Sequence, residues 1–130
     1  MSGDGEFPVV TDRVTQDGID AYAEISGDFN PLHVDPEVAA RSEFGGIIAH
    51  GPIALHSFFR AATEWLGTDA LPPGSSVKVT YRAPTRPGDE ITAVIGERHQ
   101  DADGATQLSG ECVNQDGTAV VSITAVLGGG

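Results

Sequence analysis

The sequence predicts an α+β fold, in which helices come first and an antiparallel sheet follows. Apolar residues recur near helical spacing over the first half of the chain. From Ser75 onward the pattern changes to an alternation of apolar and polar residues, which is typical of strands. Sequences typical of tight turns separate the alternating segments. This order predicts a buried helix packed on one face of a curved sheet, within a single domain of residues 1–130.

The first elements are expected between residues 7 and 26. The valines between Phe7 and Val14 suit a short edge strand. A helix over residues 16–26 follows, because Thr15 is a plausible N-cap and Gly27 a natural helix-terminating residue.

Two further helices are expected before the sheet. Residues 28–34 are predicted to be a loop, because the Asn-Pro step within them favours a turn. A short helix over residues 36–42 follows an Asp-Pro start signal. The longest apolar segment, Gly51–Leu66, has apolar residues on nearly every side, which predicts a largely buried central helix.

The second half predicts a meander of four antiparallel strands with two tight hairpin turns. Residues 1–8 and 128–130 are rich in glycine and are expected to be loose ends. The four strands are expected over residues 75–82, 91–99, 106–113 and 119–127.

The charge balance excludes several classes of partner. The chain has 7 Lys and Arg against 19 Asp and Glu, a net charge of −12. Nucleic-acid binding requires a basic surface, and anionic membranes repel an acidic one, so neither partner is expected. Met1 to Phe7 lacks the features of a signal peptide, and no apolar run is long enough to span a membrane. The expected location is therefore the cytoplasm, where the single Cys112 would remain a thiol.

Asp28, Asn30 and His33 are the first candidates for chemistry. A carboxylate and an imidazole can share a water molecule and move protons near neutral pH. The alternative is a polar turn, in which Asp and Asn bond only to the local backbone. Spacing alone favours the turn by about two to one.

The wider segment favours the catalytic interpretation over the polar turn. It resembles the signature of the MaoC-like, or hydratase 2, family, in residues 26–36 and then in Phe44, Ile47, Ile48 and the Ala-His-Gly ending at Gly51. This family includes the (R)-specific enoyl-CoA hydratases. The resemblance implies a hot-dog fold, in which an antiparallel sheet wraps around one long central helix.

The resemblance also implies a role for each matching residue. Asp28 and His33 correspond to the catalytic acid/base pair, and Asn30 to the amide that helps to hold the catalytic water. Gly51 corresponds to the glycine whose N–H binds the thioester oxygen, where negative charge develops in the transition state. Water is the second substrate, so no cofactor is expected.

The substrate-binding candidates surround Gly51. His50 is either a ligand-facing residue or a histidine satisfied by the backbone, and the second reading is favoured by about two to one. His56 stands near a position where the (R)-hydratases carry a small residue, so either His56 or Ser57 occupies it, depending on helix phase. The predicted substrate-binding residues are Phe44, Ile48, His50, Pro52 and His56.

The sequence carries no motif for a metal site, since it lacks an HExxH segment and a pair of cysteines. Arg82 and Arg86 either face the phosphates of coenzyme A or form part of a solvated surface.

The predicted function is reversible hydration of a trans-2-enoyl-CoA to an (R)-3-hydroxyacyl-CoA by a hydro-lyase. One alternative is a 3-hydroxyacyl-[acyl carrier protein] dehydratase of fatty-acid or polyketide assembly. Another is a non-catalytic hot-dog module that binds acyl-CoA. The resemblance further implies a homodimer, because a lone hot-dog domain leaves sheet edges exposed.

Overall fold

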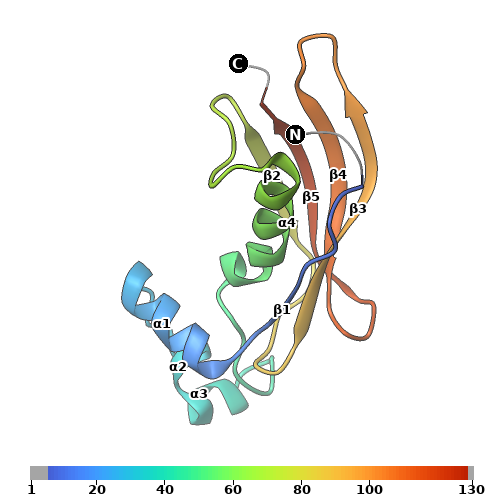
Figure 1. The fold of residues 1–130 in the computed structure, drawn as a ribbon. Coiled ribbons are helices and arrows are strands. Elements are labelled where there is room, and N and C mark those ends of the chain that lie inside the picture. The colour runs from blue at the N-terminus through green and yellow to red at the C-terminus, as the bar shows by residue number, and fades with distance from the viewer. Residues whose placement is uncertain (1–5, 129–130) are drawn as a thin grey trace.

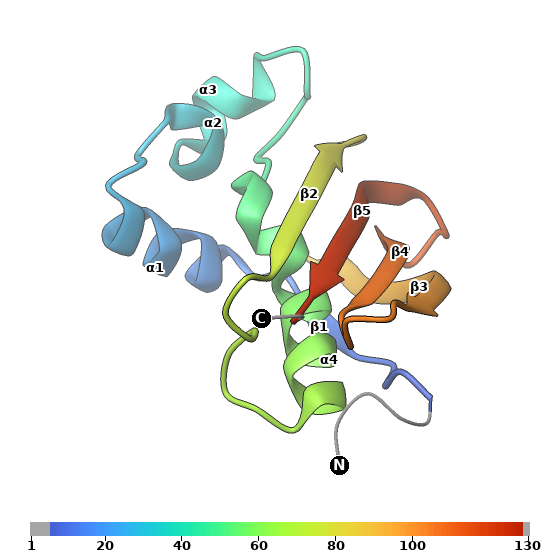
Figure 2. The ribbon, with the colours of Figure 1, turned by 90° about the horizontal axis from the view of Figure 1, so that it is seen from above.

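The computed structural model describes residues 6–128, and its centre is a five-stranded antiparallel sheet with a helix against one face (Figure 1). Seen from above, the helix α4 lies along the concave side of the sheet, and α1 to α3 lie beyond one end of it (Figure 2). The elements are β1 (Thr11–Arg13), α1 (Gln16–Ser26), α2 (Pro31–Val34), α3 (Pro36–Ala40), the 3₁₀ helix η1 (Gly51–Leu55), α4 (His56–Leu66), β2 (Ser76–Tyr81), β3 (Glu90–Gln100), β4 (Thr106–Val113) and β5 (Ala119–Leu127).

All predicted strands are present, but their neighbours differ from a four-stranded meander. The sheet order is β1-β3-β4-β5-β2, so the meander comprises only β3, β4 and β5. β2 pairs with β5 at one edge of the sheet, and β1 pairs with β3 at the other. The alternation of residues identifies a strand but not its partner. The connection over residues 82–89, which contains two prolines, carries the chain from one edge strand to the interior of the sheet.

The central helix begins at Gly51 as predicted, although its first turn is a 3₁₀ helix. Pro52 has no N–H, and the Ile53 N–H donates to the His50 carbonyl at 3.1 Å, which is the short spacing of a 3₁₀ turn. The helix was predicted to be largely buried, but one side of α4 is exposed, as Arg60 and Glu64 show. Its opposite side packs on the sheet through Phe58, Ala61, Ala62 and Trp65.

The predicted loop over residues 28–34 contains the short helix α2. The Asn30 side chain accepts a hydrogen bond from the Leu32 N–H at 3.0 Å, and Pro31 occupies the first helical turn. These are helix-starting interactions, so the polar turn continues into one turn of helix. The preceding helix ends at Gly27, as predicted, with a φ of 77° that favours glycine.

The predicted loose ends are partly wrong within the described residues. Phe7 packs against the core, and its ring centroid lies 5.1 Å from that of Trp65. The Gly128 N–H donates to the Ser75 hydroxyl at 2.9 Å. Residues 1–5 and 129–130 lie outside the described part of the chain. No helix among residues 6–128 is both long and apolar enough to cross a membrane.

The single cysteine is expected to be unreactive in the folded protein. Cys112 is fully buried between β4 and α4, and this burial raises the pKa of its thiol. Because the thiolate is the reactive species, Ellman's reagent at pH 8 should label one thiol per chain only after urea unfolds the protein. Rapid labelling without denaturant would contradict the buried position of Cys112.

Candidate active site

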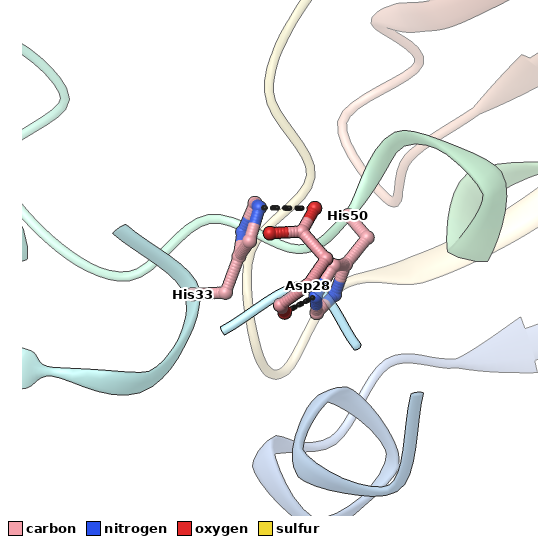
Figure 3. Close-up of side chains that lie close together, drawn as sticks. All are labelled: Asp28, His33 and His50. Atoms are coloured by element: carbon pink, nitrogen blue, oxygen red, sulfur yellow. Dashed lines mark hydrogen bonds and ion pairs between the residues drawn. The ribbon is translucent and has the colours of Figure 1, made fainter. Parts of the chain in front are cut away.

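The Asp28 carboxylate follows α1 and uses its two oxygens differently. Oδ1 accepts a hydrogen bond from the Asn30 N–H at 3.1 Å, which stabilises the local turn. Oδ2 lies 3.8 Å from Nε2 of His33 (Figure 3). The turn contact and the contact with His33, which were alternatives in the sequence, therefore coexist in one side chain.

The His33 ring is held in one tautomer by the backbone. Its Nδ1 lies 2.7 Å from the Ile48 carbonyl oxygen, which can only accept, so Nδ1 carries the N–H. In the neutral ring the lone pair is then on Nε2, the atom that faces Asp28. A water molecule within hydrogen-bonding distance of both groups could lose a proton to this lone pair.

The His50 ring lies behind His33 and is only 3% exposed. The two rings are stacked, with centroids 3.9 Å apart and planes inclined by 28°. His50 also meets the Tyr22 ring in an edge-on arrangement, with centroids 4.8 Å apart. Nε2 of His50 lies 2.9 Å from the backbone oxygen of Asp28, as the second dashed line in Figure 3 marks.

A cavity of about 380 Å³ opens beside His33. Its wall is mostly apolar, which suits a fatty acyl chain. Among the residues that line it are His33, Phe44, Ile48, Gly51 and Tyr81.

Gly51 lies on the cavity wall at the start of η1, in close contact with Tyr81. A Cβ atom on Gly51 would lie 2.8 Å from Cζ of the Tyr81 ring, so a larger residue here requires this ring to shift. Within residues 6–128 the Gly51 N–H donates no hydrogen bond, and the next residue, Pro52, has none to donate. The Gly51 N–H is therefore available to a ligand oxygen at a helix start.

Comparison with known proteins assigns the family, because residues 6–117 match the model of the MaoC like domain. The chain belongs to the MaoC-like domain family. It is 33% identical to the 3-hydroxybutyryl-CoA dehydratase of Methylorubrum extorquens over 128 residues, which covers 92% of this chain and 79% of that protein. It is 34% identical over 84 residues to a mitochondrial 3-hydroxyacyl-[acyl-carrier-protein] dehydratase of Arabidopsis thaliana, covering 62% of this chain and 47% of that one.

The fold of this MaoC-like domain is similar to that of an (R)-hydratase from A. caviae involved in PHA biosynthesis. The two superpose with a TM-score of 0.78 at 27% identity, over 95% of this chain and 94% of the other. The hot-dog fold implied by the sequence signature is therefore confirmed. The names of the relatives also agree with the predicted hydro-lyase class.

The structure brings together five of the residues that the sequence singled out. His33, Phe44, Ile48 and Gly51 all line the cavity, and Asp28 faces His33 beside it. Asn30 lies between the acid and the imidazole in the chain. Its side-chain oxygen caps α2 through the Leu32 N–H, so its visible contribution is to hold the helix that carries His33.

Three predicted substrate-binding residues lie away from the cavity wall. His50 is buried behind His33, where a backbone oxygen satisfies Nε2. Pro52 is exposed, at the start of η1. His56 points to β1, where its Nδ1 lies 3.1 Å from Oδ2 of Asp12, and the phase of α4 instead buries Ser57. Of the two residues weighed for this position, Ser57 rather than His56 therefore lies on the inward side of the helix.

Tyr81 is a cavity residue that sequence reasoning missed. It ends β2, and it shares the inward face of that strand with Val77 and Val79. The pKa of its phenol is raised, mainly because part of the ring is buried and to a smaller extent because Tyr22 is nearby. The hydroxyl thus stays protonated at neutral pH and remains a hydrogen-bond donor. Strand alternation could have identified this inward position, but only the fold brings it against Gly51.

The two arginines weighed for phosphate binding differ in their contacts. Arg82 lines the cavity and donates from Nε to the Ser122 hydroxyl at 3.0 Å. Arg86 donates from Nη2 to the Phe44 carbonyl at 2.5 Å and so holds the loop that carries Phe44. Arg82 thus lies at the cavity, whereas Arg86 stabilises the loop.

One group among the described residues has ligand atoms close enough for a metal ion. Asp28, His33 and His50 each offer one atom within 4.8 Å of the others. The stacking of the His33 and His50 rings works against metal binding. An imidazole lone pair lies in the plane of its ring, so lone pairs of two stacked rings do not converge on one ion. The arrangement fits proton transfer better than coordination.

Proposed function

We propose that this MaoC-like domain catalyses the reversible hydration of a trans-2-enoyl-CoA to an (R)-3-hydroxyacyl-CoA. The supporting observation is the pair formed by Asp28 Oδ2 and His33 Nε2 at 3.8 Å, beside a cavity that also contains Gly51. An acid/base pair and a backbone donor are the two parts that the reaction requires.

The proposed reaction begins at a water molecule between Asp28 and His33. His33 accepts a proton from this water through Nε2, and the Asp28 carboxylate stabilises the imidazolium that forms. The hydroxide oxygen bonds to Cβ of the enoyl group, and the C=C electrons move onto the thioester oxygen. The Gly51 N–H stabilises that negative charge. Return of the proton from His33 to Cα yields the 3-hydroxyacyl thioester and restores the pair.

The test is hydration of crotonyl-CoA, followed by loss of enoyl absorbance in the presence of the purified chain. Turnover that yields the (R)-3-hydroxy product supports the proposal. A chain that binds CoA thioesters with a measurable Kd, but does not turn them over, would instead be a binding module.

A second candidate is dehydration of 3-hydroxyacyl groups carried on an acyl carrier protein. It is suggested by the 34% identity to the mitochondrial dehydratase. The net charge of −12 disfavours it, because acyl carrier proteins are acidic and like charges slow association. Turnover of a carrier-linked substrate in preference to the matching CoA thioester would favour this candidate.

Phe44 is expected to limit the length of the acyl chain. Phe44→Ala leaves the backbone bond from Arg86 in place and enlarges the cavity. Relative to wild type, kcat/KM should then improve by up to about fourfold for each added methylene that fits, since a buried CH₂ contributes about 0.8 kcal/mol.

The matched control for this variant is Phe59→Ala, which removes a ring 36% exposed on α4, away from the cavity. Its chain-length profile should equal that of wild type. An unchanged profile in Phe44→Ala would remove Phe44 from the acyl site.

We further propose that the chain forms a homodimer through the free edge of β2. Among residues 6–128 this edge strand pairs only with β5, and Tyr81 at its end is 51% exposed although it faces the cavity. Pairing with a second copy would protect the edge and cover Tyr81. Light scattering should give about twice the 13.4 kDa mass of one chain. A monomer would contradict the proposal.

A further inference from the structure

His50 is the feature of the site that the proposed reaction leaves unused. It is 3% exposed and does not line the cavity, yet it contacts both catalytic residues. It stacks on the His33 ring with centroids 3.9 Å apart, and it bonds to the backbone of Asp28 at 2.9 Å. His50 thus contacts both members of the Asp28–His33 pair, and the proposed reaction depends on the distance between these two residues.

The bond to Asp28 has a defined direction. A carbonyl oxygen only accepts, so Nε2 of His50 carries the N–H and donates. Nδ1 of the same ring is buried and has no hydrogen-bond partner within residues 6–128. The ring is therefore held at this place by one donated bond and by packing between His33 and Tyr22.

We propose that His50 is a positioning residue, whose donated bond holds the Asp28 backbone so that Oδ2 stays against Nε2 of His33. Asp28 needs such a support, because its side chain is 53% exposed and its segment lies between α1 and α2. His50 acts through Asp28 and His33 and touches no substrate atom. The inference rests on the proposed hydration, in which these two residues share one water.

Two substitutions distinguish the effect of the hydrogen bond to Asp28 from the effect of the ring stacked on His33. His50→Gln places an amide Nε2 the same number of bonds from Cβ as the imidazole Nε2, so it keeps the donor and loses the ring. His50→Phe keeps a flat ring against His33 and loses the donor. A positioning role predicts that glutamine rescues and phenylalanine does not.

The kinetic test compares both variants with wild type on crotonyl-CoA. His50→Phe is expected to lower kcat about 10- to 100-fold with little change in KM, because small misplacements of a catalytic group are costly. His50→Gln is expected to remain within about threefold of wild type, the size of a weakened hydrogen bond. A rise in KM alone would make His50 a substrate contact and would overturn the proposal.

A readout that does not require turnover distinguishes this inference from the reaction itself. The Asn30 N–H bonds to the Asp28 carboxylate, so ¹⁵N relaxation at Asn30 reports on the order of that side chain. Greater mobility in His50→Phe, but not in His50→Gln, supports the proposal even if wild type hydrates no thioester. Equal mobility of Asn30 in the two variants would overturn the proposal. So would an equal loss of kcat in both variants that accompanies a lower Tm, because His50 would then have only a structural role.

Discussion

Replacing His33 by alanine is expected to lower kcat for enoyl-CoA hydration by about 10²–10⁴-fold, the usual contribution of a general acid/base. The ring supplies the lone pair on Nε2 that faces Asp28, and no other described residue presents an imidazole to the cavity wall. KM should change little, because most of the cavity wall remains. The assay is loss of enoyl absorbance at saturating substrate.

Asp28→Asn is the matched partner of this experiment. The amide keeps an oxygen to accept the Asn30 N–H, so the turn is retained, but it removes the negative charge that faces His33. We expect a similar loss of kcat with an unchanged Tm, since the side chain is 53% exposed. Turnover near that of wild type in both variants would eliminate the proposed mechanism.

Gly51→Ala keeps the backbone N–H but is expected to displace it, and so to lower kcat/KM by up to about 10²–10³-fold, the cost of losing an oxyanion donor. The added methyl would lie 2.8 Å from Cζ and 2.9 Å from Cε1 of Tyr81. Either the tyrosine ring is pushed into the cavity or the Gly51 backbone turns away from it. Both movements disturb the site where the thioester oxygen is expected.

Gly46→Ala is a suitable control for this substitution. A Cβ there would lie 3.4 Å from Nη1 of Arg86, which is close to an ordinary contact, and kcat/KM should stay near the wild-type value. Tyr81→Ala combined with Gly51→Ala removes the clash and should restore part of the loss. A Gly51→Ala enzyme as active as wild type would show that the Tyr81 ring moves aside without disturbing the site, and that the close contact with glycine is not required.

Local sequence signals were sufficient for most of the secondary structure. Caps at Thr15 and Gly27 fix both ends of α1, and the turn glycines at 104 and 117 have the positive φ that hairpins require. The position of β2 was not predictable in this way. Its residues show which face is buried, but pairing with β5 depends on contacts between segments distant in the chain.

The candidate site was predictable where its chemistry is local. Asp28 and His33 are five residues apart and a single capped turn joins them, so the pair follows from the segment itself. The roles of His50 and His56 depend on three-dimensional context. His50 turns inward to the Asp28 backbone, while the first turn of α4 directs His56 to Asp12. Tyr81 joins Gly51 only because β2 ends beside η1.

The location of α1 to α3 beyond the end of the sheet also bears on stability (Figure 2). The segment that carries Asp28 and His33 follows α1, which packs on the core through Ile19, and it has few backbone bonds of its own to the rest, such as that from the Ile48 N–H to the Leu32 carbonyl. The extensive ladders of β3, β4 and β5 do not include this segment. Such a segment can open as a cooperative unit at a lower free energy than global unfolding requires. Enzyme inactivation in mild urea would then precede the loss of β-sheet.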